Sequence, residues 1–143
     1  MTAFAARPII PRRTILTYGR FDGFGAAEAA LLKRLCCMGA DLIVGCSTDE
    51  FADANGAPCR DGFRRRRETL EACRYVSRVI PETCWEQKRT DIVNYNVSIF
   101  AMTEDWRGAF DDLQDIVDVL YVPLGSSDPA MQPMGEYRHG TFN

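Results

Sequence analysis

The sequence predicts an α/β fold in which a five-stranded, mainly parallel sheet is covered by helices on both faces. Short apolar or β-branched runs of strand length alternate along the chain with segments whose apolar residues recur at helical spacing. Alternation of this kind is typical of parallel strands joined by right-handed crossovers. The chain has 143 residues, 46% of them hydrophobic and 26% charged, which fits one globular domain.

The first strand–helix–strand unit follows an N-terminal arm over residues 1–13. Thr14–Tyr18 (TILTY) is β-branched and is followed by a glycine, as expected of a strand that leads into a loop. Ala26–Met38 has apolar residues at helical spacing, and Gly39 is placed as a C-terminal cap. Asp41–Thr48 (DLIVGCST) is a continuous apolar run, which is typical of a strand buried on both faces.

The rest of the chain predicts three more strands. The loop ADANGAPCRDG precedes a helix that Asp61 or Gly62 can cap. The expected elements then follow in this order: helix 64–75, strand 75–81, short helix 87–96, strand 97–102, short helix 109–116 and strand 117–124. We expect the domain to span residues 14–128 and an irregular, turn-rich tail to occupy 129–143.

The expected topology also predicts where a ligand binds. In an open parallel sheet, ligands bind beyond the carboxyl ends of the strands. The loops expected to surround one cleft at that edge are Gly19–Gly25, Thr48–Asp61, Thr103–Gly108 and Leu124–Pro133. Any function should be sought there.

Charge and composition argue against several classes of partner. The net charge of −3 gives no electrostatic footprint for nucleic acid. No apolar run reaches the roughly 18–20 residues needed to span a bilayer, and the first residues lack the apolar block of a signal peptide. We therefore expect a cytoplasmic protein with no nucleic-acid or membrane partner.

The cysteines are interpreted as reduced thiols. They form no CxxC pair, and most lie in apolar or helical patterns, as small buried hydrophobes do. The six positions are Cys36, Cys37, Cys46, Cys59, Cys73 and Cys84. Because the chain has one histidine and its thiols lack ligand spacing, we expect no metal site among them.

Several short stretches resemble, in order and spacing, those of the glycerol-3-phosphate cytidylyltransferases, a branch of the nucleotidyltransferase superfamily. The matching stretches are TYGRFDGFG, STDEF, RYVSRVIPE, WEQK, DIV and EDWRG, and the similarity runs from about Thr14 to Pro123. The resemblance implies a Rossmann-like nucleotidyltransferase fold and a homodimer that pairs through RYVSRV. It also implies transfer of CMP from CTP to glycerol 3-phosphate, giving CDP-glycerol and pyrophosphate with help from a divalent cation.

The family motif HxGH, however, falls on the residues Gly25 to Glu28. Nucleotidyl transfer needs donors that stabilise charge on the phosphoryl oxygens, and the family meets this need with the two histidines at a helix start. Gly25 and Glu28 occupy the histidine positions, and the one histidine of the chain, His139, lies in the tail. Glu28 either faces the phosphates, which it would repel, or turns outward as a favourable acid in the first helical turn.

Two further phosphate-handling elements of the family are also missing. Its loop lysines fall on Asn55 and Ala57, which carry no charge. Its RTEGISTT segment falls on Leu124–Met131, where Pro129 and the absence of an arginine argue against an equivalent site. Losing several such donors should reduce the rate by at least about 10⁴-fold. We therefore expect the family reaction to be very slow or absent.

Other residues of the family's nucleotide and acceptor sites are retained. They are Tyr18, Gly19, Phe21, Asp22, Arg66, Trp85, Glu104, Asp105 and Trp106. Asp22 either holds a metal or shapes its loop. Arg66 either binds the acceptor phosphate or belongs to a solvated helix face, the run Arg64–Arg67. The aromatic residues either form a ligand platform or pack in the core.

Two hypotheses follow, and we favour the first. The first is a non-catalytic, dimeric binding or regulatory member of the family that binds a nucleotide or a phosphorylated alcohol. The second is a divergent nucleotidyltransferase in which the Arg64–Arg67 cluster replaces the lost cations. Neither requires a cofactor, although Mg²⁺ would accompany a bound nucleoside triphosphate. A flavin or dinucleotide carrier is disfavoured because GRFDGFGAAE is not a GxGxxG fingerprint.

Overall fold

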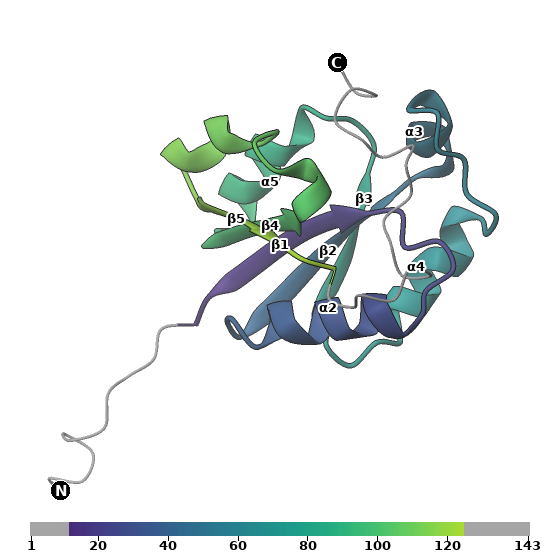
Figure 1. The fold of residues 1–143 in the computed structure, drawn as a ribbon, viewed down its shortest axis with the longest axis horizontal. Coiled ribbons are helices and arrows are strands. Elements are labelled where there is room, and N and C mark those ends of the chain that lie inside the picture. Colours follow the sequence, from purple (N-terminus) through teal and green to yellow (C-terminus); the bar gives the residue numbers. More distant parts are fainter. Residues whose placement is uncertain (1–11, 125–143) are drawn as a thin grey trace, which may run out of the picture.

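The computed structural model describes residues 12–124, and it shows a five-stranded parallel sheet (Figure 1). The strand order is β3-β2-β1-β4-β5. The elements are β1 (Thr14–Gly19), α2 (Ala26–Cys36), β2 (Asp41–Ser47), α3 (Asp49–Ala54), α4 (Phe63–Glu71), β3 (Arg78–Glu82), α5 (Gln87–Asn94), β4 (Ile99–Thr103), the 3₁₀ turns η1 (Glu104–Trp106) and η2 (Asp111–Asp115), and β5 (Asp118–Val122). The predicted α/β fold with five parallel strands is confirmed.

The two faces of the sheet carry separate hydrophobic layers. On one face, Leu32 of α2 and Leu70 of α4 pack in a cluster with Ile15 of β1. On the other face, Ile92 of α5 packs with Leu16 of β1 and with residues of η1 and η2. Ile15 and Leu16 are neighbours whose side chains point to opposite faces because side chains alternate along a strand. Figure 1 shows α2 and α4 on one side of the strands and α5 on the other.

A close approach between β1 and β2 fixes the position of one candidate residue. Tyr18 pairs in register with Gly45 of β2. A Cβ atom added to Gly45 would lie 2.1 Å from Cδ1 of Tyr18, so only glycine leaves room for the ring. The carboxyl end of β1 therefore presents Tyr18 in one defined place.

Some element boundaries differ from the prediction. The expected loop Thr48–Asp61 contains the helix α3, whose start is capped by Thr48, because its Oγ1 accepts a hydrogen bond from the Phe51 N–H over 3.2 Å. The helix expected over 64–75 ends at Glu71, and the strand expected from residue 75 begins at Arg78. The short helix expected over 109–116 is a 3₁₀ turn.

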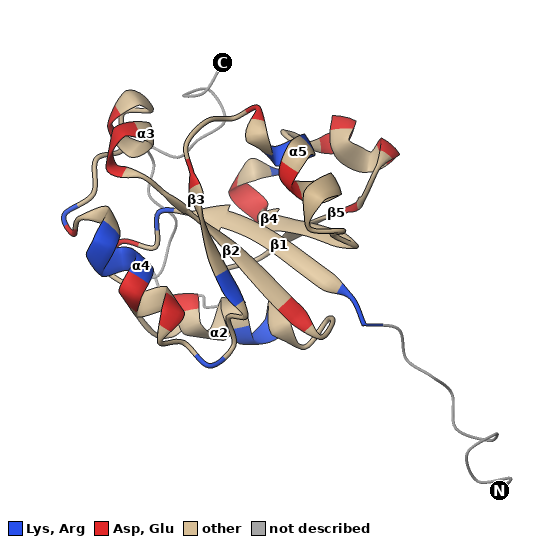
Figure 2. Cartoon of the chain, turned by 180° about the vertical axis from the view of Figure 1, so that it is seen from behind, with Lys and Arg blue, Asp and Glu red and all other residues tan. Residues whose placement is uncertain are grey.

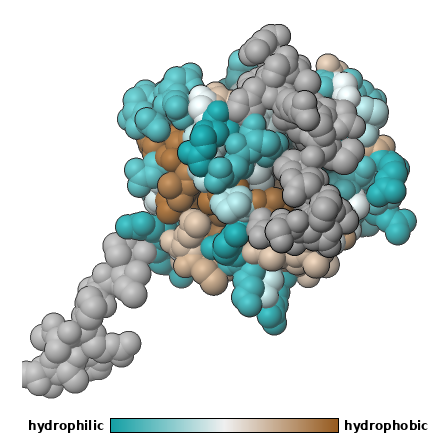
Figure 3. Space-filling model, viewed as in Figure 1, coloured by the Kyte–Doolittle hydropathy of each residue, from teal (hydrophilic) through white to brown (hydrophobic). Residues whose placement is uncertain are grey.

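The edge strand β5 is partly exposed at the surface of the molecule. Figure 3 shows hydrophobic side chains where the edge strand β5 lies, with hydrophilic ones around them, and Leu120 of this strand is partly exposed. Within residues 12–124, no helix is both long and apolar enough to cross a bilayer. The N-terminal arm up to residue 11, the tail 129–143 and all but the first residue of the loop Leu124–Pro133 lie outside the described residues.

Candidate functional site

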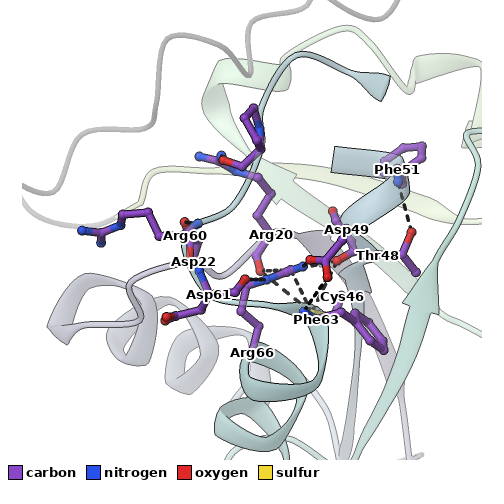
Figure 4. Close-up of polar contacts among 12 residues, drawn as sticks. Arg20, Asp22, Cys46, Thr48, Asp49, Phe51, Arg60, Asp61, Phe63 and Arg66 are labelled. Atoms are coloured by element: carbon purple, nitrogen blue, oxygen red, sulfur yellow. Dashed lines mark hydrogen bonds and ion pairs between the residues drawn. The ribbon is translucent and has the colours of Figure 1, made fainter. Parts of the chain in front are cut away.

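The loops expected to carry function meet at one edge of the sheet. All strands are parallel, so the segments that follow β1, β2, β3 and β4 leave the sheet at the same end. The loop after β1 and the segment between β2 and α4 are joined there by a set of polar contacts (Figure 4).

Asp22 joins the two loops through backbone groups. Its Oδ2 accepts a hydrogen bond from the Arg60 N–H over 2.8 Å, and its Oδ1 accepts one from the Asp61 N–H over 3.0 Å (Figure 4). Partial burial opposes ionisation, but these two bonds and nearby arginines outweigh it and hold the pKa of Asp22 below its usual value. No group of three or more metal-ligating side chains occurs within residues 12–124. The geometry favours the loop-shaping interpretation of Asp22.

Arg66 is buried at the centre of the same junction. Its side chain is 1% exposed, so the interpretation of Arg66 as part of a solvated helix face is wrong. Its Nε donates to the Asp61 carbonyl over 2.9 Å. Its Nη1 donates to the carbonyls of Arg20 and Ser47 over 2.9 and 2.8 Å. The helix α4 turns this one arginine inward because it shares a face with the buried Leu70, four residues on.

Arg66 also donates through Nη1 to the Cys46 Sγ over 3.5 Å, and it forms an ion pair. Its Nη2 lies 2.8 Å from Oδ1 of Asp49, and the other oxygen of Asp49 accepts a hydrogen bond from the Phe63 N–H at the start of α4 over 3.2 Å. The bond from Phe63 and then the bond from Arg66 lower the pKa of the Asp49 carboxyl. The guanidinium thus bonds three backbone carbonyls and one carboxylate, and it positions the loop after β1 and the loop before α4 relative to the end of β2.

The remaining arginines of the run Arg64–Arg67 lie on the exposed side of α4. Arg64 pairs with Glu68 over 3.4 Å, and Arg67 pairs with Glu71 over 3.1 Å. Figure 2 shows basic and acidic residues side by side on this helix. Such exposed pairs four residues apart are common on helix surfaces and contribute little to stability. The four arginines therefore do not form one cluster directed at the loops.

Glu28 lies against the start of α2. Its Oε1 accepts a hydrogen bond from the Gly25 N–H over 2.9 Å, and the side chain is half-buried. An acid in the first turn interacts favourably with the helix dipole, and here it also satisfies a donor that the helix leaves unpaired. The carboxylate thus folds back over the helix start instead of turning away from it. A negative charge therefore lies at the start of α2, the end of a helix that favours anions.

Three further retained residues, Tyr18, Gly19 and Phe21, lie at or just after the carboxyl end of β1. Phe21 has a φ of 52°, in the left-handed region that few side chains adopt. Its ring lies over Gly19, where an added Cβ would be 2.9 Å from the ring. Tyr18 donates its hydroxyl hydrogen to Oδ2 of Asp91 over 2.5 Å. Burial, then the contact with Asp91, raises the pKa of Tyr18, so the hydroxyl stays protonated.

Trp85 and Trp106 lie together at the same edge. Their rings are 5.7 Å apart, and Trp85 also contacts Phe51 at 5.0 Å. The Trp85 Nε1–H donates a hydrogen bond to Oδ1 of Asn55 over 3.1 Å. Trp106 is 6% exposed, which indicates packing, whereas Trp85 is only partly buried. Asn55, one of the two positions where the family carries a lysine, therefore supports an aromatic residue of the site.

Glu104 and Asp105 of η1 are held by local contacts. Arg107 lies 3.0 Å from the Glu104 carboxylate, at the surface. Asp105 accepts a hydrogen bond from the Thr103 hydroxyl over 2.5 Å. Both acids thus fix the turn that follows β4 and places Trp106. Their proposed part in binding is a prediction that these contacts leave open.

The sequence reasoning did not single out the most deeply buried ion pair of the site. Lys88 and Glu82 are each 4% exposed, and their Nζ and Oε2 atoms are 2.6 Å apart. The Ser47 hydroxyl donates to the other oxygen of Glu82 over 2.7 Å. The Lys88 ammonium also lies 4.2 Å from the centroid of the Tyr18 ring and 4.6 Å from that of Trp85. Lys88 belongs to the WEQK stretch and shares a helix face with the buried Ile92, which could have indicated its burial.

The buried cations near this edge are bonded to groups of the protein itself. Arg20 donates through Nη1 to the carbonyls of Ala57 and Pro58 over 2.9 and 3.2 Å. Arg66 and Lys88 have the partners given above. The sequence places no histidine within residues 12–124. Arg20, Arg66 and Lys88 thus bond to backbone carbonyls and carboxylates that hold the loops at this edge.

Comparison with known proteins identifies a family that matches most of the chain. A family model described as cytidylyltransferase-like matches residues 16–123. A glycerol-3-phosphate cytidylyltransferase from Bacillus subtilis (strain 168) is 40% identical over 111 residues, which cover 78% of this chain and 86% of that protein. One from Staphylococcus aureus (strain NCTC 8325 / PS 47) is 39% identical over 110 residues, covering 77% and 83%.

A solved structure shares the fold at much lower identity. The lipopolysaccharide core biosynthesis protein from Thermoplasma volcanium GSS1 has a TM-score of 0.72 to this chain at 17% identity, covering 81% of this chain and 100% of that chain. This likeness concerns the fold alone. Because the family model spans most of the chain and relatives of about 40% identity cover most of both sequences, the protein belongs to the cytidylyltransferase-like family.

Proposed function

We propose that this chain is a non-catalytic, dimeric member of the cytidylyltransferase-like family that binds a nucleotide or a phosphorylated alcohol and does not transfer CMP. The observation that carries the proposal is the contact between Glu28 and Gly25, the two residues at the family's histidine positions. There the Glu28 carboxylate accepts the Gly25 N–H at the start of α2. A carboxylate replaces two imidazoles where polyphosphate charge must be stabilised.

Electrostatics indicate the size of the effect. A phosphate about 4 Å from the Glu28 carboxylate would be repelled by roughly 4 kcal/mol at an effective dielectric constant of 20. That energy corresponds to about a thousandfold in affinity. The missing transition-state donors lower the rate separately, by at least about 10⁴-fold in total. The repulsion by Glu28 and the missing donors both slow the transfer of CMP. Only the repulsion by Glu28 also weakens the binding of the triphosphate.

The retained residues support a remaining binding role. Asp22 and Arg66 hold the loops after β1 and before α4 in place. Trp85 is only partly buried beside the carboxyl ends of the strands, where it can stack on a base or an alcohol. These residues offer contacts for the base or the alcohol end of a ligand such as CTP, CDP-glycerol or glycerol 3-phosphate, and not for its phosphates.

Turnover and binding have to be measured separately to test the proposal. Purified protein is incubated with CTP, glycerol 3-phosphate and Mg²⁺, and pyrophosphate release is followed, with the Bacillus subtilis relative as the positive control. We expect no release above background. Calorimetric titrations of CTP and CDP-glycerol, with and without Mg²⁺, then measure binding. Product formation by the purified protein would overturn the proposal, as would the absence of any binding.

A second candidate is CMP transfer itself. It is favoured by the 40% identity to a glycerol-3-phosphate cytidylyltransferase over most of both chains. In this case donors other than Arg66 must replace the imidazoles, because Arg66 already bonds three carbonyls and Asp49. Reinstating the family residues with Gly25→His and Glu28→His separates the two candidates. The double variant gains activity if only the donors are missing, and it changes little if the present chain already transfers CMP.

The dimer is proposed from the segment RYVSRV, at the amino end of the edge strand β3. A cavity of about 410 Å³ opens there. It is lined by Arg67, Glu71, Val76, Ser77, Arg78 and Val79. An edge strand beside a cavity can accept the same surface of a second copy. Light scattering on the purified chain tests this, with Val76→Glu as the variant expected to be monomeric.

A further inference from the structure

The edge strand β5 has an apolar sequence but is only partly covered. None of its five residues, Asp118–Val122 (DVLYV), is buried, and Leu120 is 37% exposed. Within residues 12–124, β5 pairs with β4 alone, so the other side of its backbone, which we call the free edge, faces no strand (Figure 1). An unpaired apolar edge is a template for pairing with another segment.

The surroundings of the free edge are acidic. The segment from residue 104 to residue 118 holds one basic residue, Arg107, and six acids. The acids are Glu104, Asp105, Asp111, Asp112, Asp115 and Asp118. Asp118, the first residue of β5, is exposed, and in the part of the chain that the structure describes it forms no ion pair. A segment that pairs with β5 should therefore be apolar and carry positive charge opposite Asp118.

The N-terminal arm has this composition. Residues 1–13 (MTAFAARPIIPRR) contain three arginines and no acid, and the first six are apolar except for one threonine. The tail 125–143, which also lies outside the described residues, contains two acids and one arginine. Charge therefore favours the arm over the tail. It also disfavours a second copy of β5, since that pairing would bring two acidic edges together.

The arm enters the sheet close enough to β5 to reach it. Ile15 of β1 is in register with Ile99 of β4, and Ile99 is in register with Asp118. The starts of these three strands are therefore level. A strand added beyond β5 would lie three strand spacings from β1, which is about 14 Å. Residues 8–13 can extend over about 20 Å, so they can cover this distance.

We infer that residues 2–7 of the arm bind the free edge of β5 as a sixth, antiparallel strand of the same chain. The direction follows from the connection, because the arm must run toward the amino edge of the sheet before it enters β1. Pro8 and Pro11 then belong to the crossing segment and not to the strand, where their missing N–H groups would cost hydrogen bonds. The inference goes beyond the proposed function, since the free edge binds neither a nucleotide nor an alcohol.

Charge sets the register of the added strand. Arg7 is placed opposite Asp118, which has no other ion-pair partner within residues 12–124. Three positions further along the antiparallel pair, Phe4 lies opposite Tyr121. Tyr121 is only partly buried against the layer that contains Ile92, and an aromatic pair across two strands covers it further.

Photo-cross-linking in the full-length chain tests the pairing. The photoreactive residue p-benzoylphenylalanine replaces Phe4, and tandem mass spectrometry locates the residues to which it is linked after irradiation. We expect links to residues 119–122. An equal mixture of unlabelled and isotope-labelled chains separates links within one chain from links between chains. Links between chains, links only to other elements, or the absence of any link would each overturn the inference.

A charge reversal tests the register. Asp118→Arg should lower the yield of the link by at least about threefold, because Arg7 then faces a like charge. Combining it with Arg7→Asp should restore the yield, since the charges are exchanged. Asp53→Arg, at an exposed aspartate of α3, is the matched control and should leave the yield unchanged. Circular dichroism checks folding, and equal yields in folded Asp118→Arg and Asp53→Arg contradict the pairing.

Hydrogen exchange gives a readout on the unmodified protein. Backbone amides of residues 3–7 that pair with β5 should exchange at least about tenfold more slowly in the full-length chain than in a synthetic peptide of residues 1–13. In Asp118→Arg this protection should be reduced. Exchange of these amides at the rate of the peptide in the wild type would show that the arm does not pair with β5.

Discussion

Arg66 and Asp49 form an ion pair of 2.8 Å in which the guanidinium is 1% exposed and the carboxylate 49% exposed. Only the guanidinium of the pair is buried. The loop after β1 and the loop before α4 both bond to this guanidinium through backbone carbonyls. Three backbone carbonyls also depend on the same guanidinium. This relationship yields the first prediction on stability.

Arg66→Ala should lower the free energy of unfolding by about 3 kcal/mol or more, because it leaves buried carbonyls and Asp49 without their donor. Arg66→Lys should recover only part of the loss, since an ammonium cannot span the same carbonyls. Urea denaturation measures the change. The neighbouring Arg65 is exposed, and Arg65→Ala should stay within about 0.5 kcal/mol of the wild type. A similar effect of the two alanine variants would contradict the positioning role.

Asp22 should make stability depend on pH in the acid range. Its folded pKa lies below the usual value of 3.8, so the folded state binds fewer protons than the unfolded state in that window. Its contribution is fully present above the unfolded pKa and is lost as the pH falls through the folded pKa. Asp22→Asn should therefore be destabilised most near pH 7, and the difference from wild type should shrink below about pH 4.

Denaturant unfolding between pH 3 and pH 7 tests the role of Asp22. Asp53 is an exposed aspartate of α3 and serves as the control. Asp53→Asn should show no comparable pH-dependent difference. A destabilisation of Asp22→Asn that is constant with pH would show that the carboxylate charge is not what the two loop N–H groups require.

Glu28→Gln should strengthen the binding of anions at the start of α2. The substitution removes the negative charge and keeps an oxygen that can accept the Gly25 N–H. We expect CTP affinity to rise by at least about tenfold, at a cost of no more than about 1 kcal/mol in stability from the lost dipole interaction. Calorimetry checks the affinity. Glu50→Gln, at an exposed first-turn position of α3, should leave it unchanged.

The buried pair of Lys88 and Glu82 should show strong coupling in a double-mutant cycle. Removing one partner leaves a buried charge and should cost about 3–5 kcal/mol, whereas removing both charges should cost much less than the sum. The variants are Lys88→Met, Glu82→Gln and their combination, compared by urea denaturation. Additive losses would indicate that the 2.6 Å contact in the structure does not couple the two residues.

The fold could be predicted from the sequence because it depends on patterns that extend over many residues. The apolar runs of β1 and β2 and the periodicity of α2 identified the first unit. The helix α3 has six residues, too few for periodicity to separate it from the loop. Its signal was Thr48 followed by acids, which is the composition of a capped helix start.

The site was predicted less well. In a run of identical residues such as Arg64–Arg67, the sequence does not show which side chain is buried. The four arginines of α4 suggested one solvated face, yet Arg66 points inward with Leu70. The same rule applies to Lys88 and Ile92 in α5. In both helices a buried cation precedes a buried aliphatic residue by four positions. The partners that make such burial favourable come from distant segments, which local patterns do not contain.

The hydrogen bonds of Arg66 to carbonyl oxygens have an evolutionary consequence. Every amino acid has a main-chain carbonyl. Substitutions at Arg20, Ser47 and Asp61 therefore leave these three hydrogen bonds to the Arg66 guanidinium possible. The conformation of the loops therefore does not depend on the side chains that the loops carry. Substitutions of those side chains can change the chemistry of the site while the loops keep their positions.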